Sequence, residues 1–236
     1  MYANSLTMLS QVIHRRSLNA IILFIVFLSS YTDNKKPSGD EQSKAVKDNT
    51  TTIKKKTIVF FGNSLTAGYG LSPEQAFPAL IQKKIDSLDL PYQVINAGVS
   101  GETSSGGTTR VDWILQQPVD IFVLELGGND GLRGIPLSET KKNLQDIIDK
   151  VKAKNPNIKL LFAGMQIPPN MGQKYATEFR NMFGELAAKD SMALIPFLLE
   201  GVGGDPGLNQ ADGIHPNEKG SPIVAENVWK ELQKLL

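Results

Sequence analysis

Five short apolar stretches, all after residue 56, predict the β-strands of this chain. They lie at residues 57–61, 92–96, 120–126, 158–164 and 192–195. Short, nearly continuous apolar runs are typical of strands that are buried on both faces of a sheet. The pattern therefore predicts a buried sheet rather than one with a solvent-exposed face.

Amphipathic stretches between these runs predict helices. Residues 138–154 carry Leu144, Ile147, Ile148 and Val151 at the spacing of one helix face. Further helices are expected at residues 73–88, with Ser72 as the N-cap, and at residues 174–190 and 221–236. Strands that alternate with helices indicate an α/β fold, in which a parallel sheet is covered on both faces.

The first 56 residues have a different pattern. In residues 1–31, Arg15 and Arg16 precede the run "LNAIILFIVFLSS", which is typical of a secretory signal peptide or an N-terminal anchor. Residues 32–56 are polar and charged, as in a flexible linker. We expect an exported protein, periplasmic or extracellular and membrane-tethered if the first segment is retained, with its folded domain at residues 57–236.

The composition of the chain excludes several kinds of binding and catalysis. The net charge of +1 provides no basic field for nucleic acid. Cysteine is absent from the sequence, which excludes disulfides, thiolate metal sites and a cysteine nucleophile. His14 and His215 are the two histidines, so chemistry that uses imidazole in the predicted domain depends on His215.

Two polar segments could supply a nucleophile and its base. Ser64, in "GNSLTAGYG", follows the first predicted strand and is either a nucleophile or a helix cap. Asp212 and His215 lie three residues apart in "ADGIHPNEKG". A carboxylate can orient an imidazole through one ring nitrogen and leave the other free to accept a proton.

Two glycine-rich loops follow other predicted strands, where ligands bind in parallel sheets. In "NAGVSGETSSGG" the backbone N–H of Gly101 can approach a ligand closely, and in "ELGGNDGLRG" the Asn129 amide can donate a hydrogen bond. Both loops can equally serve as simple turns.

Other chemistries fit the sequence less well. The glycine-rich segments lack the Lys-Ser/Thr sequel of a phosphate-binding loop. One histidine with scattered carboxylates makes a poor metal site. For glycoside cleavage, no spacing selects a pair among Glu102, Glu125, Asp130 and Asp212.

Together, the blocks around Ser64, Gly101, Asn129 and His215 resemble the SGNH, or GDSL, hydrolase superfamily. The likeness extends over residues 57–236 and is greatest to the secreted bacterial thioesterase, arylesterase and lysophospholipase branch. It implies a three-layer α/β/α sandwich, flavodoxin-like, with a mostly parallel five-stranded sheet. It also implies hydrolysis of esters or thioesters through an acyl-serine, without a cofactor or metal.

The resemblance assigns roles to individual residues. Ser64 would attack the substrate, His215 would act as base and then acid, and Asp212 would orient His215. The backbone N–H groups of Ser64 and Gly101 and the Asn129 amide would form the oxyanion hole. One position departs from the family motif, because Asn63 stands where G-D-S-L has aspartate.

We expect a small-molecule ester or lipid substrate whose acyl group lies against two loops. The candidate wall residues are Leu65, Tyr69, Leu71, Ile167, Pro168 and Met171. A carbohydrate O-acetylesterase is an alternative on the same scaffold. A catalytically dead extracellular binding module is a second alternative, which the Asn63 departure suggests.

Overall fold

The computed structural model describes residues 54–168 and 172–236. Within them, five strands form one parallel sheet in the order β2-β1-β3-β4-β5. The strands are β1 (Lys56–Gly62), β2 (Tyr92–Gly98), β3 (Ile121–Glu125), β4 (Lys159–Ala163) and β5 (Ala193–Ile195). The five predicted strands are confirmed, and every pairing between them is parallel.

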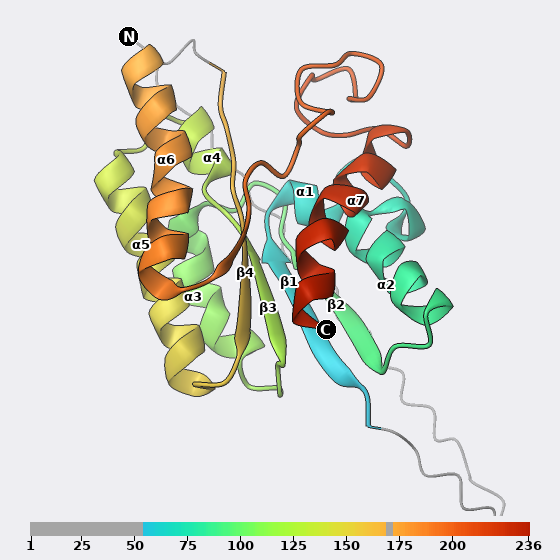
Figure 1. Ribbon diagram of the computed structural model, residues 1–236. Coiled ribbons are helices and arrows are strands. Elements are labelled where there is room, and N and C mark those ends of the chain that lie inside the picture. The colour runs from blue at the N-terminus through green and yellow to red at the C-terminus, as the bar shows by residue number, and fades with distance from the viewer. Residues whose placement is uncertain (1–53, 169–171) are drawn as a thin grey trace, which may run out of the picture. The chain divides into compact units, whose positions relative to one another are not determined.

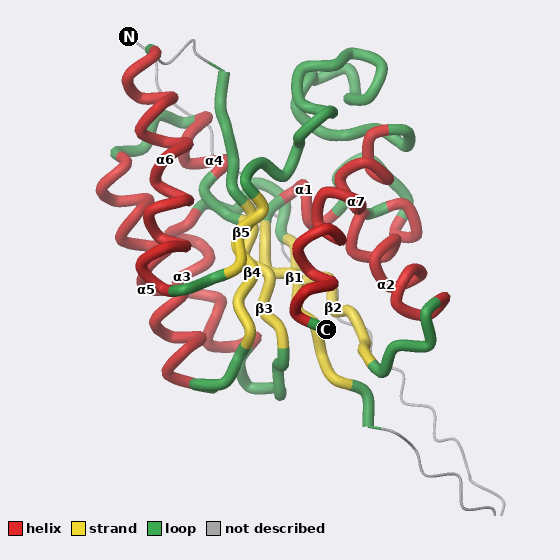
Figure 2. Tube along the Cα trace, viewed as in Figure 1, coloured by secondary structure: helices red, strands yellow, loops and turns green. Residues whose placement is uncertain are grey.

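Helices cover both faces of the sheet, which confirms the three-layer α/β/α prediction (Figures 1 and 2). On one face lie α2 (Phe77–Ser87) and α7 (Gly220–Leu232), and on the other lie α3 (Ser104–Ile114), α5 (Leu137–Lys154) and α6 (Gln173–Asp190). Two short helices, α1 (Ser64–Ala67) and α4 (Gly128–Leu132), follow β1 and β3 almost directly. Single 3-10 turns occupy Pro73–Gln75 and Gln233–Leu235.

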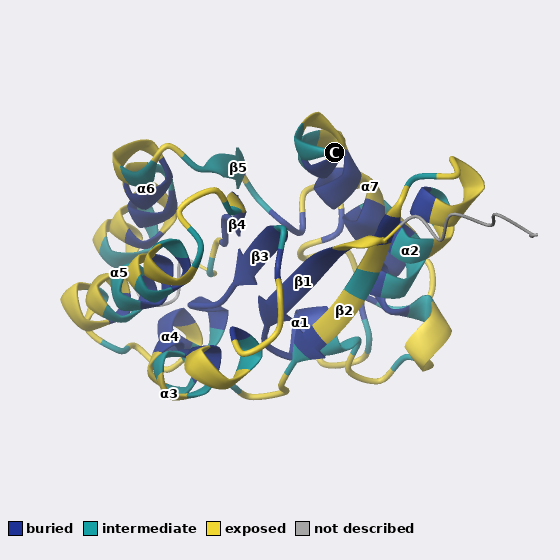
Figure 3. Ribbon diagram, turned by 90° about the horizontal axis from the view of Figure 1, so that it is seen from below, coloured by how far each residue is buried: buried dark blue, intermediate teal, exposed yellow. Residues whose placement is uncertain are grey.

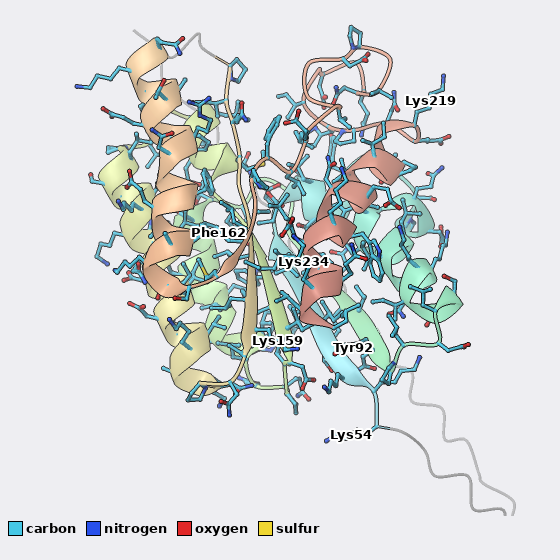
Figure 4. The ribbon with its side chains drawn as sticks, viewed as in Figure 1. Lys54, Tyr92, Lys159, Phe162, Lys219 and Lys234 are labelled. Carbon is cyan, nitrogen blue, oxygen red and sulfur yellow. The ribbon has the colours of Figure 1, made fainter. Side chains whose placement is uncertain are left out.

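Aromatic side chains fill the two interfaces between sheet and helices. The Phe60 ring packs edge-on against Phe77 of α2, with ring centres 5.5 Å apart. On the other face, the Phe162 ring lies 5.2 Å from that of Phe183 on α6 (Figure 4). Viewed along the strands, β1 and β3 are buried between the layers (Figure 3). Four predicted α5 positions, Leu144, Ile147, Ile148 and Val151, are also buried.

Some helix predictions were wrong. Helix α3 was missed because its sequence, SSGGTTRVDWI, contains two glycines and four β-branched residues, which favour helix weakly. The predicted helix at residues 73–88 is divided, because Ala76 adopts extended angles (φ −60°, ψ 138°) between the 3-10 turn and α2. Ser72 therefore precedes the turn and does not cap α2.

The predicted signal or anchor at residues 1–31 lies outside the described residues, as does most of the predicted linker. Among helices in the described part of the chain, none combines the length and apolarity needed to cross a membrane. The C-terminal end is fastened to the sheet, since the Tyr92 hydroxyl donates to the Leu236 carbonyl at 2.9 Å.

Candidate active site

The carboxyl ends of the parallel strands bring the predicted site segments to one edge of the sheet. Ser64 is the first residue of α1, directly beyond β1. Asp212 and His215 lie in the long segment between β5 and α7, which passes near α1 (Figure 1). The two segments are 151 residues apart in sequence at the contact between Ser64 and His215.

Ser64, His215 and Asp212 form a continuous hydrogen-bonded relay. The Ser64 Oγ lies 2.8 Å from His215 Nε2, and His215 Nδ1 lies 2.6 Å from Asp212 Oδ2. The carboxylate accepts a hydrogen, so Nδ1 carries the ring proton and Nε2 is left to accept one from Ser64. This is the arrangement in which a serine hydroxyl is activated for attack.

Asp212 is held in its charged form. Burial acts to raise its pKa, but hydrogen bonds from His215 and Ile214 outweigh this effect and lower the pKa to about 2. Its Oδ1 accepts from the backbone N–H groups of Ile214 at 2.9 Å and His215 at 3.0 Å. The carboxylate therefore remains ionised well below neutral pH and fixes both the loop and the imidazole.

Gln210, which the sequence analysis did not identify, ties the histidine loop to the serine loop. Its side-chain amide donates to the Tyr69 carbonyl at 2.6 Å and to the Pro216 carbonyl at 3.1 Å. Its backbone N–H donates to the His215 carbonyl at 2.7 Å. The Tyr69 ring also lies 4.7 Å from the imidazole ring, so the histidine is supported on two sides.

The three residues predicted to form an oxyanion hole lie together in the structure. Ser64, Gly101 and Asn129 all line the same cleft. Asn129 Nδ2 donates one hydrogen to the Glu102 carbonyl at 2.9 Å, which leaves its second hydrogen available. Gly101 adopts a φ of +81°, a conformation that side chains disfavour.

Arg133 and Asp130 hold the loops of Gly101 and Asn129 in place, although neither role was predicted. The Arg133 guanidinium donates to the Gly101 carbonyl at 3.1 Å. The fully buried Asp130 accepts from the Ser104 backbone N–H at 2.9 Å and its hydroxyl at 2.5 Å. Asp130 thus joins the start of α3 to α4, and the two loops are set relative to each other.

Asn63 caps the short helix that begins at Ser64. Its Oδ1 accepts from the Leu65 backbone N–H at 2.9 Å and lies 3.4 Å from the Ser64 Oγ. An aspartate can form the same cap. The departure from the G-D-S-L motif therefore preserves the local turn while it removes a negative charge beside Ser64.

A cleft of about 550 Å³ opens at the relay. Of the predicted wall residues, Leu65, Tyr69, Ile167 and Pro168 line it. Leu71 lies instead at a second hollow of about 10 Å³ that Ser64 also lines, and Met171 falls outside the described residues. Apolar wall residues that the sequence analysis missed are Leu132, Met165, Phe197, Leu199 and Ile214.

The carboxylates considered for glycoside cleavage are engaged in other interactions or buried. Glu102 forms a two-pronged ion pair with Arg110, at 2.8 and 2.5 Å. Glu125 and Asp130 are buried. Among residues 54–168 and 172–236, no cluster of three or more histidine, aspartate or glutamate side chains is placed to hold a metal ion.

Comparison with known proteins identifies the family of the chain. A sequence model of the GDSL-like lipase/acylhydrolase family matches residues 60–222. Esterase TesA of Pseudomonas aeruginosa is 42% identical over 182 residues, which cover 77% of this chain and 90% of that protein. Thioesterase 1/protease 1/lysophospholipase L1 of Escherichia coli is 39% identical over 181 residues, 76% of this chain and 85% of that protein.

Solved structures are similar over the same region. The crystal structure of TesA superposes with a TM-score of 0.74 and covers 77% of this chain and 100% of that one. A structure of the psychrotrophic esterase EstA from Pseudoalteromonas sp., inhibited by monoethylphosphonate, is 34% identical with a TM-score of 0.72. It covers 76% of this chain and 97% of its own.

Proposed function

Since the chain belongs to the GDSL-like lipase/acylhydrolase family and is a carboxylic ester hydrolase, we propose that it cleaves esters and thioesters through an acyl intermediate on Ser64. The observation that carries this proposal is the 2.8 Å contact between Ser64 Oγ and His215 Nε2 at the cleft. Asp212, at 2.6 Å from Nδ1, completes the relay.

Catalysis would proceed in two halves. Ser64 Oγ attacks the acyl carbon and gives its proton to His215 Nε2, which returns that proton to the departing alcohol or thiol. His215 then takes a proton from water, whose oxygen attacks the acyl-serine; the carboxylic acid departs as the bond to Ser64 Oγ breaks, and His215 returns its proton to that oxygen. The N–H groups of Ser64 and Gly101 and the Asn129 amide stabilise the oxyanion in both halves.

The substrate would be an aryl or short-to-medium acyl ester or thioester, with lysophospholipids as a further class. The apolar side chains of the cleft suit an acyl chain, and the name of the Escherichia coli relative includes both thioesterase and lysophospholipase. We also propose that residues 57–236 are the catalytic domain and that residues 1–31 direct export of the protein.

Hydrolysis of p-nitrophenyl acetate, butyrate and octanoate by the purified chain tests this function. Each methylene buried in the cleft contributes about 0.8 kcal/mol, so the two methylenes added from acetate to butyrate are expected to raise kcat/KM by up to about fifteenfold. Ser64→Ala serves as the control. Turnover of acetate alone would favour the carbohydrate O-acetylesterase, and no turnover above the control would favour the binding module.

A further inference from the structure

The Glu125 carboxyl lies beneath the turn that carries Ser64 and has no part in the reaction above. Its side chain is 1% exposed. Oε1 accepts from Asn63 Nδ2 at 2.7 Å, while Oε2 accepts from the Asn63 backbone N–H at 3.1 Å and the Thr66 hydroxyl at 2.8 Å. These donors lie on either side of Ser64, so the carboxylate holds the turn before and after the nucleophile.

The close approach of this carboxyl to the turn depends on Gly62. A Cβ atom at Gly62 would lie 2.2 Å from Thr66 Oγ1 and 2.6 Å from Glu125 Oε2. Such distances are shorter than van der Waals contact allows. The glycine that precedes the Asn-Ser pair therefore leaves room for the carboxyl group.

The Asn63 side chain has a single favourable orientation between its neighbours. Nδ2 faces the Glu125 carboxylate, and Oδ1 accepts from the Leu65 backbone N–H. Aspartate, which the family motif has here, would bring a second carboxylate against Glu125. Two ionised carboxylates at this distance repel each other strongly, so such a pair keeps a shared proton until the pH rises above a raised pKa.

Among the described residues, the hydrogen-bond partners of the Glu125 carboxyl are all neutral groups, from Asn63 and Thr66. Burial raises its pKa to about 7, although hydrogen bonds from Thr66 and Asn63 act to lower it. The charged groups on surrounding elements have other partners: Asp130 accepts from Ser104, Arg110 pairs with Glu102, and His215 and Asp212 pair with each other.

We propose that Glu125 is a positioning residue for Ser64, and that the Asn63 amide allows it to hold the nucleophile turn without a shared proton. The Asn63 amide donates its own hydrogen to Glu125 at any pH. An aspartate at this position and Glu125 would instead have to bind a proton from solvent to make the same hydrogen bond. The position of Ser64 is therefore expected not to change as the pH rises above neutral. This inference rests on the proposed function, because its effect on rate is read through Ser64.

The Asn63→Asp variant tests the shared proton. Above neutral pH the new acid pair loses its proton, and two buried charges in contact push the turn away from its active position. Displacement of reacting groups by about 1 Å can cost about a hundredfold. We expect kcat of the variant to fall about tenfold or more between about pH 8 and about pH 9.5, with KM little changed, whereas wild-type kcat stays level.

Two further variants provide matched controls. Glu125→Gln places two amides together, and its single acceptor oxygen cannot serve three donors, so kcat should fall at every pH. The double variant, Asn63→Asp with Glu125→Gln, restores one carboxylate facing one amide. We expect it to lose the alkaline fall and to exceed the kcat of Asn63→Asp at about pH 9.5.

A melting curve provides a readout that does not depend on activity. The acid pair has a folded-state pKa above its unfolded value, so stability that is present at low pH is lost as pH rises through the folded value. The melting temperature of Asn63→Asp should thus fall relative to wild type over the same range.

Three results would overturn the inference. The first is a dependence of kcat on alkaline pH in Asn63→Asp that matches wild type. The second is a lower melting temperature of this variant with unchanged kcat, which would leave Glu125 only a structural role. The third is full activity in Glu125→Gln. The proposed function fails separately, if wild-type hydrolysis persists after Ser64→Ala.

Discussion

Replacement of Ser64 by alanine is expected to lower kcat/KM for p-nitrophenyl butyrate by about 10⁵-fold or more. The hydroxyl oxygen forms the covalent bond, and no other hydroxyl is described at 2.8 Å from His215 Nε2. His215→Ala should cost about as much, because the serine is a weak nucleophile without its base. The double variant should be no slower than either single variant, since the two residues act as one unit.

Ser105→Ala is a suitable control for this loss. Ser105 is exposed near the start of α3, and its replacement should leave hydrolysis and melting temperature unchanged. The assignment of Ser64 would be wrong if Ser64→Ala, folded as judged by circular dichroism, kept more than about one per cent of wild-type kcat/KM.

Replacement of Asn129 by alanine is expected to lower kcat by about 10²- to 10³-fold, with a small effect on KM. The hydrogen that is not donated to the Glu102 carbonyl stabilises charge that exists mainly in the transition state. Steady-state kinetics with p-nitrophenyl butyrate separates the two parameters.

The control for Asn129 is Asn157→Ala, on an exposed turn before β4. It should behave as wild type. An unchanged kcat in Asn129→Ala would remove Asn129 from the oxyanion hole. An increase in KM alone would assign it to ground-state binding of the substrate.

The sheet was predictable because its strands are buried on both faces, so each one is a nearly uninterrupted apolar run such as "TIVFF". Helix α5 was predictable because one face is apolar and the other charged. Helix α3 was not predictable, because glycine favours helix weakly in isolation. In the fold, Gly107 is required within the helix because a side chain there would clash with Leu126 and Ile147. Tertiary packing overrides local propensity there.

The residues of the relay could be proposed from sequence because serine, histidine and aspartate carry recognisable chemistry. Residues that support them could not, because their roles depend on distant partners. Glu125 contacts Asn63 across 62 positions, and Gln210 contacts Tyr69 across 141. Nothing in the local sequence of either residue indicates the loop that it holds.

The cleft wall was only partly predictable for a similar reason. Phe197 and Leu199 belong to the segment that follows β5, where an apolar pair can pack into the core as readily as face a ligand. Leu71 follows the serine loop in sequence, yet it lines the small second hollow, with Phe77 and Val224, and not the main cleft.

The most direct test of the central claim is to map the residue that a fluorophosphonate labels. Mass spectrometry of the digested protein should find a single adduct, on the peptide that contains Ser64. An excess of ester substrate should slow the labelling, and Ser64→Ala should abolish it. An adduct on a different residue, or an actively hydrolysing protein that acquires none, would contradict the acyl-serine mechanism.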